Sequence, residues 1–404
     1  MKIAMVSEHA SPLSPPWAHN GGGQVVQVAE LASALASGGH DVTVYTRRDS
    51  PDLPDTLVDS QGYRIEHVEA GPAEYIPRDD VLPHLAEFGR HLGAAITENR
   101  PDIVHAHYWL SGMVSLAAAQ DRRIPVVQTF HGLGGPKRRI LRGNDTSPPG
   151  RIRMEQVIAR SVSHVIATTT EQLGDLIRLG VPRRRVTVVP CGVDTARFNP
   201  TGPAAGDGRV PRVVSVGRFG ESKGFDVLIQ ALRRVPDAEL VVGGGGDSDG
   251  EADIAEQKRL TDIADRCGVG HRLSMIGPVA RTEMPGLLRS ASVVASLPAY
   301  EPFGMVPLEA MACGVPVVAS AVGGHLDTVV DGVTGVLVPP GRPDLTGTVL
   351  KELLGDPVQL DAYGVAGADR ARSRYSWERV AGATIRLYGD VLGVPRPAAA
   401  EAIG

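Results

Sequence analysis

Two glutamates, Glu301 and Glu309, frame the segment with the strongest chemical signal in the chain. Pro307 suits the first position of a helix and Gly314 can end one, so we predict Glu309 in the first helical turn and Glu301 in the preceding loop. The amides between them then lie at a helix start, where N–H groups without intrahelical partners can bind hydroxyls or an anion. These amides belong to Phe303, Gly304, Met305 and Val306.

The two carboxylates need not face one bond, because only one of them lies in the predicted helix. Their spacing therefore does not imply paired-carboxylate hydrolysis. A carboxylate beside a ligand can instead bind the two hydroxyls of a ribose, as in dinucleotide-binding folds. The simpler alternative is a helix cap followed by a surface glutamate.

A second segment places two cations in one loop. Residues 212–216 have the pattern of a buried strand, and Arg218 and Lys223 follow in a loop that contains glycine. Fixed cations can stabilise the negative charge that builds on a leaving group as its bond breaks. Arg can donate two parallel bonds to phosphate oxygens, whereas Lys acts as a point charge. The pair predicts a phosphate site; solvated side chains in a turn are the alternative.

An N-terminal loop ends in Asn20 and three glycines, of which Gly22 and Gly23 directly precede a helix predicted at 24–37. Glycine lets the backbone approach a ligand closely, and a helix N-terminus favours phosphate. The G-x-G-x-x-G spacing is incomplete, so a dinucleotide fingerprint is not supported. A plain tight turn is the alternative to a ligand-binding loop.

Two patterns could suggest a metal. His105 and His107 have H-x-H spacing, but no third ligand follows at a useful distance in the sequence. Asp247 and Asp249 superficially resemble a metal-binding D-x-D pair, yet they stand in a loop rich in Gly and Asp that we interpret as solvated. We therefore expect no metal and no cofactor.

The segments around these residues alternate between strand and helix. Helical spacing predicts helices at 24–37 and 111–120. Apolar runs predict strands at 1–7, 41–46, 103–105, 126–129 and 165–168. Short connections between such elements are typical of a parallel sheet, whose ligands collect at the carboxyl ends of the strands.

A segment rich in Pro and Gly, residues 199–211, lacks periodicity and predicts a linker between domains. The alternation then restarts with a helix at 226–235 and strands at 212–216, 239–242, 292–296 and 317–320. We therefore expect two doubly wound, Rossmann-like α/β domains, residues 1–200 and 201–376, facing each other across a cleft. An amphipathic helix at 377–392, packing back toward the first domain, and a loose tail complete residues 377–404.

Length and composition support this organisation. A chain of 404 residues is longer than a single hydrophobic core usually supports. Its composition, with 42% apolar and 22% charged residues, excludes general disorder. A net charge of −5 argues against nucleic-acid binding by bulk electrostatics. The three cysteines, Cys191, Cys267 and Cys313, form no C-x-x-C pair and fit a reducing compartment. Because we find neither a signal-peptide core nor an apolar run long enough to span a membrane, we expect a cytoplasmic protein. The sequence does not decide whether it forms a homo-oligomer.

These motifs together resemble the retaining glycosyltransferases of family 4, which have the two-domain GT-B fold. The E-x7-E motif of that family matches Glu301 and Glu309. Glu301-Pro-Phe-Gly is the commonest sequence with which this motif begins. Further similar segments run through most of the chain, at 105–112 (HAHYWLSG), 129–132 (TFHG), 190–194 (PCGVD) and 216–223. The first of these is most similar to the branch that contains sucrose-phosphate synthase and D-inositol-3-phosphate glycosyltransferase.

The resemblance implies roles on the donor side. Arg218 and Lys223 hold the diphosphate of a nucleotide sugar without a divalent metal, and Glu309 binds the ribose. Glu301, together with the amides of residues 303–306, orients the sugar. The glycine loop with Gly22 and Gly23 lies at the donor phosphate and the acceptor.

The resemblance also implies roles nearer the acceptor. His131 reaches the transferred sugar, and His107 and Tyr108 match residues on the acceptor side. Arg151 follows a basic run of Lys137, Arg138, Arg139 and Arg142, which either binds an acceptor phosphate or is a solvated loop. Gly132 stands where the inositol-phosphate enzymes have a Thr that contacts the acceptor phosphate, which leaves the acceptor open.

We therefore expect a retaining, metal-independent hexosyltransferase that uses a UDP- or GDP-linked sugar. Its acceptor is a hydroxyl compound such as a sugar phosphate, an inositol phosphate or a natural-product aglycone. A nucleotide-sugar epimerase, a phosphorylase and a non-catalytic binding protein are the alternatives. The chain shows no lysine in a recognisable setting for the pyridoxal group of a phosphorylase, and the complete set of Arg218, Lys223, Glu301 and Glu309 argues against a silent binder.

Overall fold

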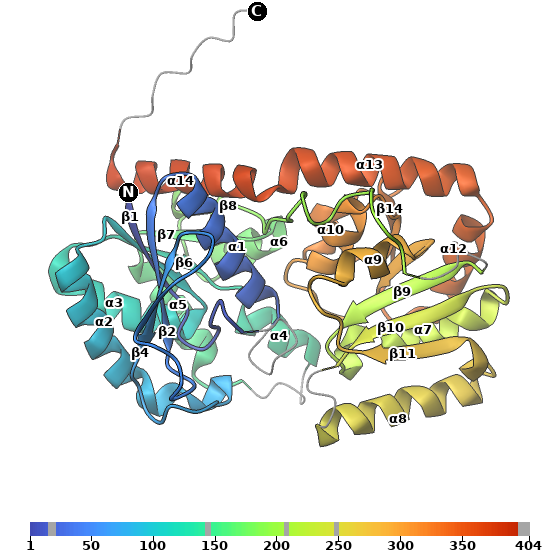
Figure 1. Ribbon diagram of the computed structural model, residues 1–404, viewed down its shortest axis with the longest axis horizontal. Helices are drawn as coiled ribbons and strands as arrows, with labels where there is room; N and C mark the ends of the chain where they lie inside the picture. The colour runs from blue at the N-terminus through green and yellow to red at the C-terminus, as the bar shows by residue number, and fades with distance from the viewer. Residues whose placement is uncertain (15–21, 142–146, 206–209, 246–249, 395–404) are drawn as a thin grey trace, which may run out of the picture.

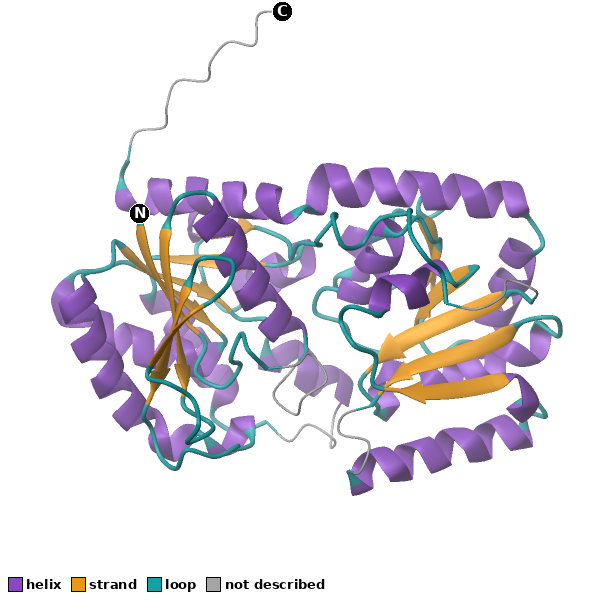
Figure 2. Ribbon diagram, in the orientation of Figure 1, coloured by secondary structure: helices purple, strands orange, loops and turns teal. Residues whose placement is uncertain are grey.

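The computed structural model describes residues 1–14, 22–141, 147–205, 210–245 and 250–394. They form two α/β domains that lie side by side, with two long helices running along one edge of both (Figure 1). Strands occupy the centre of each domain and helices cover them (Figure 2). No helix within these ranges is long and apolar enough to cross a membrane.

The first domain contains an eight-stranded sheet in the order β3-β4-β2-β1-β5-β6-β7-β8. Only β3 runs antiparallel to its neighbour. The strands are β1 (Lys2–Val6), β2 (Asp41–Arg47), β3 (Thr56–Val58), β4 (Arg64–Val68), β5 (Ile103–His107), β6 (Val126–Thr129), β7 (His164–Ala167) and β8 (Val186–Val188). The helices are α1 (Gly23–Ser37), α2 (Leu85–Asn99), α3 (Trp109–Ala119), α4 (Gly134–Leu141), α5 (Arg151–Ser161) and α6 (Thr170–Arg178).

Alternate residues of β1 enter two separate apolar cores, one on each face of this sheet. Ile3 and Met5 pack in a cluster with residues of α1, whereas Ala4 and Val6 pack in a cluster with residues of α2 and α3. This follows from the strand period of two and from helices covering both faces of a parallel sheet. The predicted doubly wound arrangement is therefore confirmed for this domain.

The second domain contains a six-stranded parallel sheet in the order β11-β10-β9-β12-β13-β14. Its strands are β9 (Arg212–Gly217), β10 (Glu239–Gly244), β11 (Leu273–Gly277), β12 (Val293–Ser296), β13 (Val317–Ser320) and β14 (Gly335–Val338). Its helices are α7 (Phe225–Ala231), α8 (Glu251–Arg266), α9 (Met284–Arg289), α10 (Met305–Ala312), α11 (His325–Thr328), α12 (Pro343–Leu354) and α13 (Pro357–Tyr375). Two apolar clusters again lie on the two faces of the sheet.

The last helix, α14 (Trp377–Leu392), returns to the first domain (Figure 1). Trp377, Val380 and Tyr388 belong to the apolar cluster that also contains Ile3 and Met5 of β1. The chain therefore crosses between the domains twice, once after β8 and once between α13 and α14. The two crossings lie side by side, because Val193 pairs with Ser376 and its N–H donates to the carbonyl of Tyr375 at 2.7 Å.

In both sheets the strand order reverses beside the first strand, at β1/β5 and at β9/β12. Ligands of open α/β sheets bind at such switch points, outside the carboxyl ends of the strands. The loops that follow β1, β5, β6, β9 and β12 carry nearly all of the candidate site residues. The topology thus explains how segments far apart in sequence reach one place.

Some local predictions differ from the structure. Helix α10 begins at Met305, so Pro307 is its third residue and Glu309 lies in its second turn. Lys137, Arg138 and Arg139 belong to helix α4 rather than to a loop. Asn20 and Gly21 of the glycine loop, the acidic pair Asp247 and Asp249, and Arg142 lie outside the described residues.

Candidate active site

A cavity of about 690 Å³ lies between the two domains. Its lining comes from the loops after β1, β5, β6, β9 and β12 and from the start of α10. Among the described residues that line it, six are cationic: Arg78, Lys137, Arg151, Arg218, Lys223 and Arg281. Two are acidic, Glu301 and Glu309. An excess of positive charge in a chain of net charge −5 makes this cavity suited to anions.

Lys223 and Glu301 meet on the second-domain side of the cavity. Lys223 Nζ lies 3.1 Å from Glu301 Oε2, and Glu301 Oε1 accepts a hydrogen bond from the N–H of Gly304 at 3.3 Å. Burial alone would raise the pKa of Glu301, but Lys223, His325 and the Gly304 N–H outweigh it, so this pKa is lowered. Glu301 is therefore ionised at neutral pH. The Gly304 amide is held by Glu301, whereas the sequence suggested that it would be free for a ligand.

The amides of Met305 and Val306 lie in the first turn of α10 and have no carbonyl four residues earlier inside the helix. Both residues line the cavity, as does Phe303. The backbone reaches this position through Gly304, whose φ of 88° is in the left-handed region. This helix start can therefore present N–H groups to hydroxyls or to an anion.

Arg218 follows β9 and is open to the solvent of the cavity, although protein atoms surround most of its guanidinium. Partial burial and the neighbouring Arg78 lower the pKa of Arg218, while Glu301 and Asp253 oppose that shift. Arg78 belongs to the first domain, in the short 3-10 helix Arg78–Asp80. Two guanidinium groups thus face one another across the cavity, an arrangement that an anion between them would stabilise.

Glu309 is 3% exposed and forms an ion pair with Arg281, through Arg281 Nη1 and Glu309 Oε1. Burial raises the pKa of Glu309, and the ion pair with Arg281 opposes the shift. The Arg281 guanidinium carbon also lies 4.5 Å from the centre of the Phe198 ring. Arg281 therefore orients Glu309 at the edge of the cavity.

The first domain contributes backbone through Gly22 and Gly23 at the start of α1, and both line the cavity. A Cβ atom on Gly23 would lie 3.3 Å from Met305 Sδ of the second domain. Gln24 lies beside them and donates to Ser7 Oγ at 3.2 Å. The glycine loop and the start of α10 therefore meet across the cavity.

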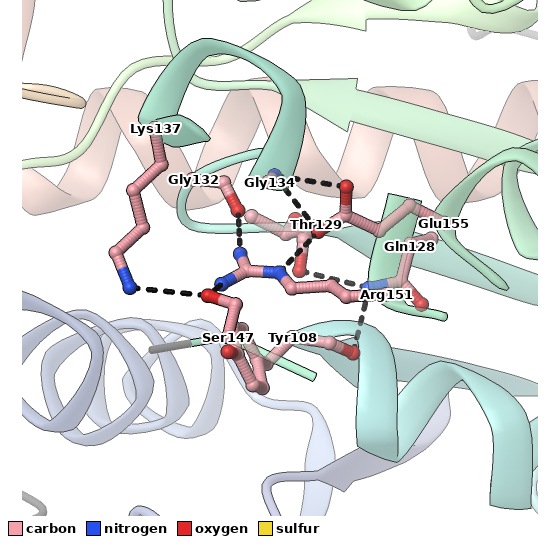
Figure 3. Close-up of polar contacts among 9 residues, drawn as sticks. All are labelled: Tyr108, Gln128, Thr129, Gly132, Gly134, Lys137, Ser147, Arg151 and Glu155. Carbon is pink, nitrogen blue, oxygen red and sulfur yellow. Dashed lines mark hydrogen bonds and ion pairs between the residues drawn. The ribbon is translucent and has the colours of Figure 1, made fainter. Parts of the chain in front are cut away.

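His131 and Tyr108 line the cavity from the ends of β6 and β5. Both have left-handed backbone angles, with φ of 58° and 77°, which are uncommon in residues other than glycine. Such conformations cluster at functional sites because the surrounding structure must hold them. Gln128 holds Tyr108 in this way, since its amide donates to the carbonyls of Tyr108 at 2.9 Å and Thr129 at 3.0 Å (Figure 3).

His107 is not a cavity residue, in contrast to the acceptor role expected from its sequence. It is 0% exposed, because it is the last residue of the buried strand β5. Its Nδ1 lies 2.9 Å from His131 Nε2, so it contacts the ring of His131 from behind. A direct contact with an acceptor is therefore excluded in this conformation.

Arg151 is the centre of a buried hydrogen-bond network (Figure 3). It donates to Glu155 Oε1 at 2.7 Å, to Ser147 Oγ at 3.1 Å and to the carbonyl of Gly132 at 2.8 Å. Glu155 also accepts from the N–H of Gly134 at 2.9 Å. The ion pair between Arg151 and Glu155 thereby fixes the loop that carries His131. Arg151 uses three of its five N–H groups in this network, so two are left for a ligand of the cavity.

Two guanidinium groups lie beside the ring of Tyr108. The guanidinium carbons of Arg78 and Arg151 lie 5.1 Å and 5.0 Å from its ring centre. Lys137 lines the same part of the cavity and donates to Ser147 Oγ at 3.1 Å (Figure 3). Of the basic run noted in the sequence, Arg139 instead reaches Asp175 on α6 at 3.3 Å.

Comparison with known proteins agrees with this geometry. The family model described as Glycosyltransferase Family 4 matches residues 21–197, and the model described as Glycosyl transferases group 1 matches residues 205–370. The D-inositol 3-phosphate glycosyltransferase of Xylanimonas cellulosilytica is 37% identical over 96% of this chain and 96% of its own length. The chain belongs to glycosyltransferase family 4. A D-inositol 3-phosphate glycosyltransferase of Kineococcus radiotolerans is also 37% identical, over 96% of this chain and 94% of its own length.

Solved structures show that this family 4 glycosyltransferase has the GT-B fold. The sucrose-phosphate synthase of Thermosynechococcus elongatus superposes with a TM-score of 0.90 at 31% identity, over 97% of this chain and 99% of the other. Anabaena HepE, solved in complex with UDP-glucose, superposes with a TM-score of 0.77 at 22% identity, over 96% and 100% of the two chains. The expected fold and the resemblance to this branch are confirmed.

Sequence reasoning about this glycosyltransferase missed the side chains of several cavity residues, among them Arg78, Arg281 and Tyr300. Arg78 stands in an irregular segment and Arg281 in a loop, so neither lies in a periodic pattern that would draw attention. Tyr300 directly precedes Glu301, and that position was the one available signal. Within the described ranges no group of three or more His, Cys, Asp or Glu is arranged to hold a metal ion.

Proposed function

We propose that this glycosyltransferase transfers a hexose from a nucleotide-diphosphate sugar to a hydroxyl of a phosphorylated acceptor, with retention at the anomeric carbon and without a metal. The acceptor is of the inositol-phosphate or sugar-phosphate kind. This choice is supported by relatives that are named D-inositol 3-phosphate glycosyltransferases and by the sucrose-phosphate synthase that shares the fold at 31% identity.

The observation that carries the proposal is the presence of two cationic groups in one cavity. Arg218 and Lys223 lie at the end of β9, beside the start of α10, and form the donor group. Arg78 and Arg151 lie beside Tyr108, and Lys137 shares Ser147 Oγ with Arg151; the three form the acceptor group. A diphosphate at the first group and a monophosphate at the second would match the charge of both.

Arg218 and Lys223 act on the leaving group in this proposal. When the bond between the anomeric carbon and the diphosphate oxygen breaks, negative charge builds on that oxygen. Cations that are already in place stabilise this charge without reorganisation. Glu309 accepts from the ribose hydroxyls, while Glu301 and the first-turn amides of α10 orient the sugar. His131 contacts the sugar from the first domain.

Retention is proposed to follow from attack on the face that the diphosphate leaves. The acceptor oxygen forms its bond to the anomeric carbon as the bond to the diphosphate breaks, and a diphosphate oxygen takes the acceptor proton. Both carboxylates of the cavity already have cationic partners, Glu301 with Lys223 and Glu309 with Arg281, which disfavours either as a covalent nucleophile. Closure of the domains would exclude water and suppress hydrolysis of the donor.

The test is a matrix of UDP- and GDP-linked hexoses against inositol phosphate, hexose phosphates and their dephosphorylated counterparts, in the presence of EDTA. We expect release of the nucleoside diphosphate only with a phosphorylated acceptor, and NMR of the product should show the anomeric configuration of the donor. Equal rates with dephosphorylated acceptors, an inverted product or full loss of activity in EDTA would contradict the proposal. A thermal shift with each nucleotide sugar identifies the donor independently of turnover.

A further inference from the structure

Three histidines lead from the core of the first domain to the cavity. His105 and His107 lie on β5 and are 1% and 0% exposed, and His131 lines the cavity. The rings of His105 and His107 lie 4.1 Å apart between centres and are tilted by 41°, and His107 Nδ1 lies 2.9 Å from His131 Nε2. These contacts raise the question of which nitrogen carries each hydrogen, because a neutral imidazole has one donor and one acceptor.

Both rings of the His107–His131 pair are neutral at physiological pH. Burial, followed by the neighbouring His105, lowers the pKa of His131 to about 3, and the pKa of His107 lies well below its ordinary value for the same reasons. The contact of 2.9 Å between two neutral rings therefore contains one N–H donor and one lone pair. Either His107 donates to His131 or the reverse holds.

The surroundings of His107 decide between these two arrangements. Its other nitrogen, Nε2, is buried and has no hydrogen-bond partner within the described part of the chain. Neighbouring His105 offers no partner, because its nitrogens already contact Tyr388 Oη at 2.7 Å and Thr129 Oγ1 at 2.8 Å. A hydrogen on His107 Nε2 would be an orphaned buried N–H, which folded proteins avoid more strictly than an unused acceptor. The hydrogen of His107 therefore belongs on Nδ1.

We propose that His107 is a positioning residue: its Nδ1–H donates to His131 Nε2 and so keeps the hydrogen of His131 on Nδ1, from which His131 donates to an oxygen of the transferred sugar. His131 Nδ1 has no hydrogen-bond partner among the described residues and is not enclosed, so it is open to the cavity that its residue lines. The same hydrogen bond fixes the ring of His131, a residue whose backbone lies in the left-handed region at φ 58°. The sugar contact rests on the proposed function, whereas the tautomer does not.

The experiment reads the tautomer directly, by NMR of the full chain labelled with ¹⁵N-histidine. The His131 signals are assigned by their loss in His131→Gln. We expect a protonated Nδ1 and an unprotonated Nε2 for His131 in the unliganded protein. His107→Asn keeps this pattern, because the Asn amide nitrogen occupies about the place of His Nδ1 and can donate in the same direction. His107→Leu removes the donor and shifts His131 toward Nε2–H, the form that neutral imidazole prefers in water.

Turnover provides a second readout. His107→Leu is expected to lower kcat by about tenfold, the effect of losing one hydrogen bond to the sugar, while His107→Asn restores most of it. A His131 hydrogen on Nε2 in the unmodified protein would overturn the inference, and this measurement needs no variant at position 107 that folds. A tautomer that stays on Nδ1 in His107→Leu would overturn it too. If the tautomer is as expected but no donor and acceptor pair reacts, the proposed function and the sugar contact fail, whereas the His131 tautomer set by His107 stands.

Discussion

The ammonium group of Lys223 lies 3.1 Å from Glu301, so a carboxylate balances its charge before any ligand binds. An entering diphosphate offers a second anionic partner, and the three donors of the ammonium can serve both. Arg218 has no carboxylate within 4 Å among the described residues, and Arg78 is its cationic neighbour. These two cations therefore differ in their surroundings, although they follow the same strand.

For Lys223→Met and Arg218→Met we expect kcat to fall by about 10²- to 10³-fold, since each removes one charge aimed at the leaving group. The KM for the donor should change much less, because the charge to be stabilised appears mainly as the bond breaks. Steady-state kinetics with the donor found in the substrate matrix measures both constants. Lys351→Met, at an exposed lysine of α12, is the control and should leave kcat unchanged. Unchanged kcat in both cavity variants would remove these residues from the mechanism.

At the scale of elements, the start of α10 depends on a residue without a side chain. Gly304 has φ 88°, and a Cβ there would lie 2.6 Å from His325 Cδ2 of α11. His325 is itself buried, and its Nδ1–H donates to the Ser320 carbonyl at 2.9 Å. The helix start that carries the donor-side amides is therefore fixed by packing between α10 and α11.

Gly304→Ala is expected to raise the KM for the donor by at least tenfold and to lower the midpoint of thermal unfolding, because the loop must shift to accommodate the methyl group. Gly389→Ala is the matched control. Gly389 lies inside α14 with open space around its Cβ position, so the substitution should be neutral or stabilising by about 0.5–1 kcal/mol. Donor binding by calorimetry and thermal unfolding check both variants. A Gly304→Ala protein with normal donor affinity would contradict the importance of this helix start.

The sequence was sufficient to predict the central strands, because buried parallel strands are continuous apolar runs. Only some of the covering helices were predicted, among them α1, α3, α7 and α14. The bounds predicted for α14 agree with the structure, since its apolar face is regular and Gly393 ends it. The strands β3, β4, β8, β11 and β14 were not predicted. Each has three to five residues and lies at or next to a sheet edge, where an apolar run is too short to stand out.

The candidate site was predictable where backbone geometry imposes a sequence pattern, as at the glutamate pair and the glycine loop. It was not predictable where a side chain reaches the cavity from an irregular segment, as Arg78 does. The role of His107 was also misjudged, because H-x-H spacing on a strand places both histidines on the same face but does not say which one is exposed. Only the packing of β5 against β6 reveals that His107 lies behind His131.

At the scale of the molecule, three buried neutral histidines couple folding to pH. Burial lowers the pKa of His105 and His131 to about 3 and that of His107 well below 6.5. Unfolding exposes all three, and the unfolded chain then binds protons that the folded chain does not. Stability is therefore complete above about pH 6.5 and falls as the pH decreases toward 3.

We expect the free energy of unfolding to decrease below pH 6.5 by up to about 1.4 kcal/mol per pH unit for each of these histidines. Urea unfolding between pH 7.5 and pH 5 measures the slope. The slope should become smaller in His107→Asn, which removes one titrating group, and stay the same in His271→Gln, at an exposed position. A stability that is constant from pH 7.5 to pH 5 would mean that these rings titrate normally in the folded protein.

Helix α14 has a consequence for how the chain is made. Trp377, Val380 and Tyr388 complete the apolar cluster around β1, and Tyr388 also contacts His105. The ribosome synthesises these residues after the second domain, so the domain that emerges first lacks part of its interior until the second domain has been made. The whole sheet of the second domain lies between residues 212 and 338, so this domain can fold before the first domain is complete. In the sequence, the second domain is therefore inserted between two parts of the first domain.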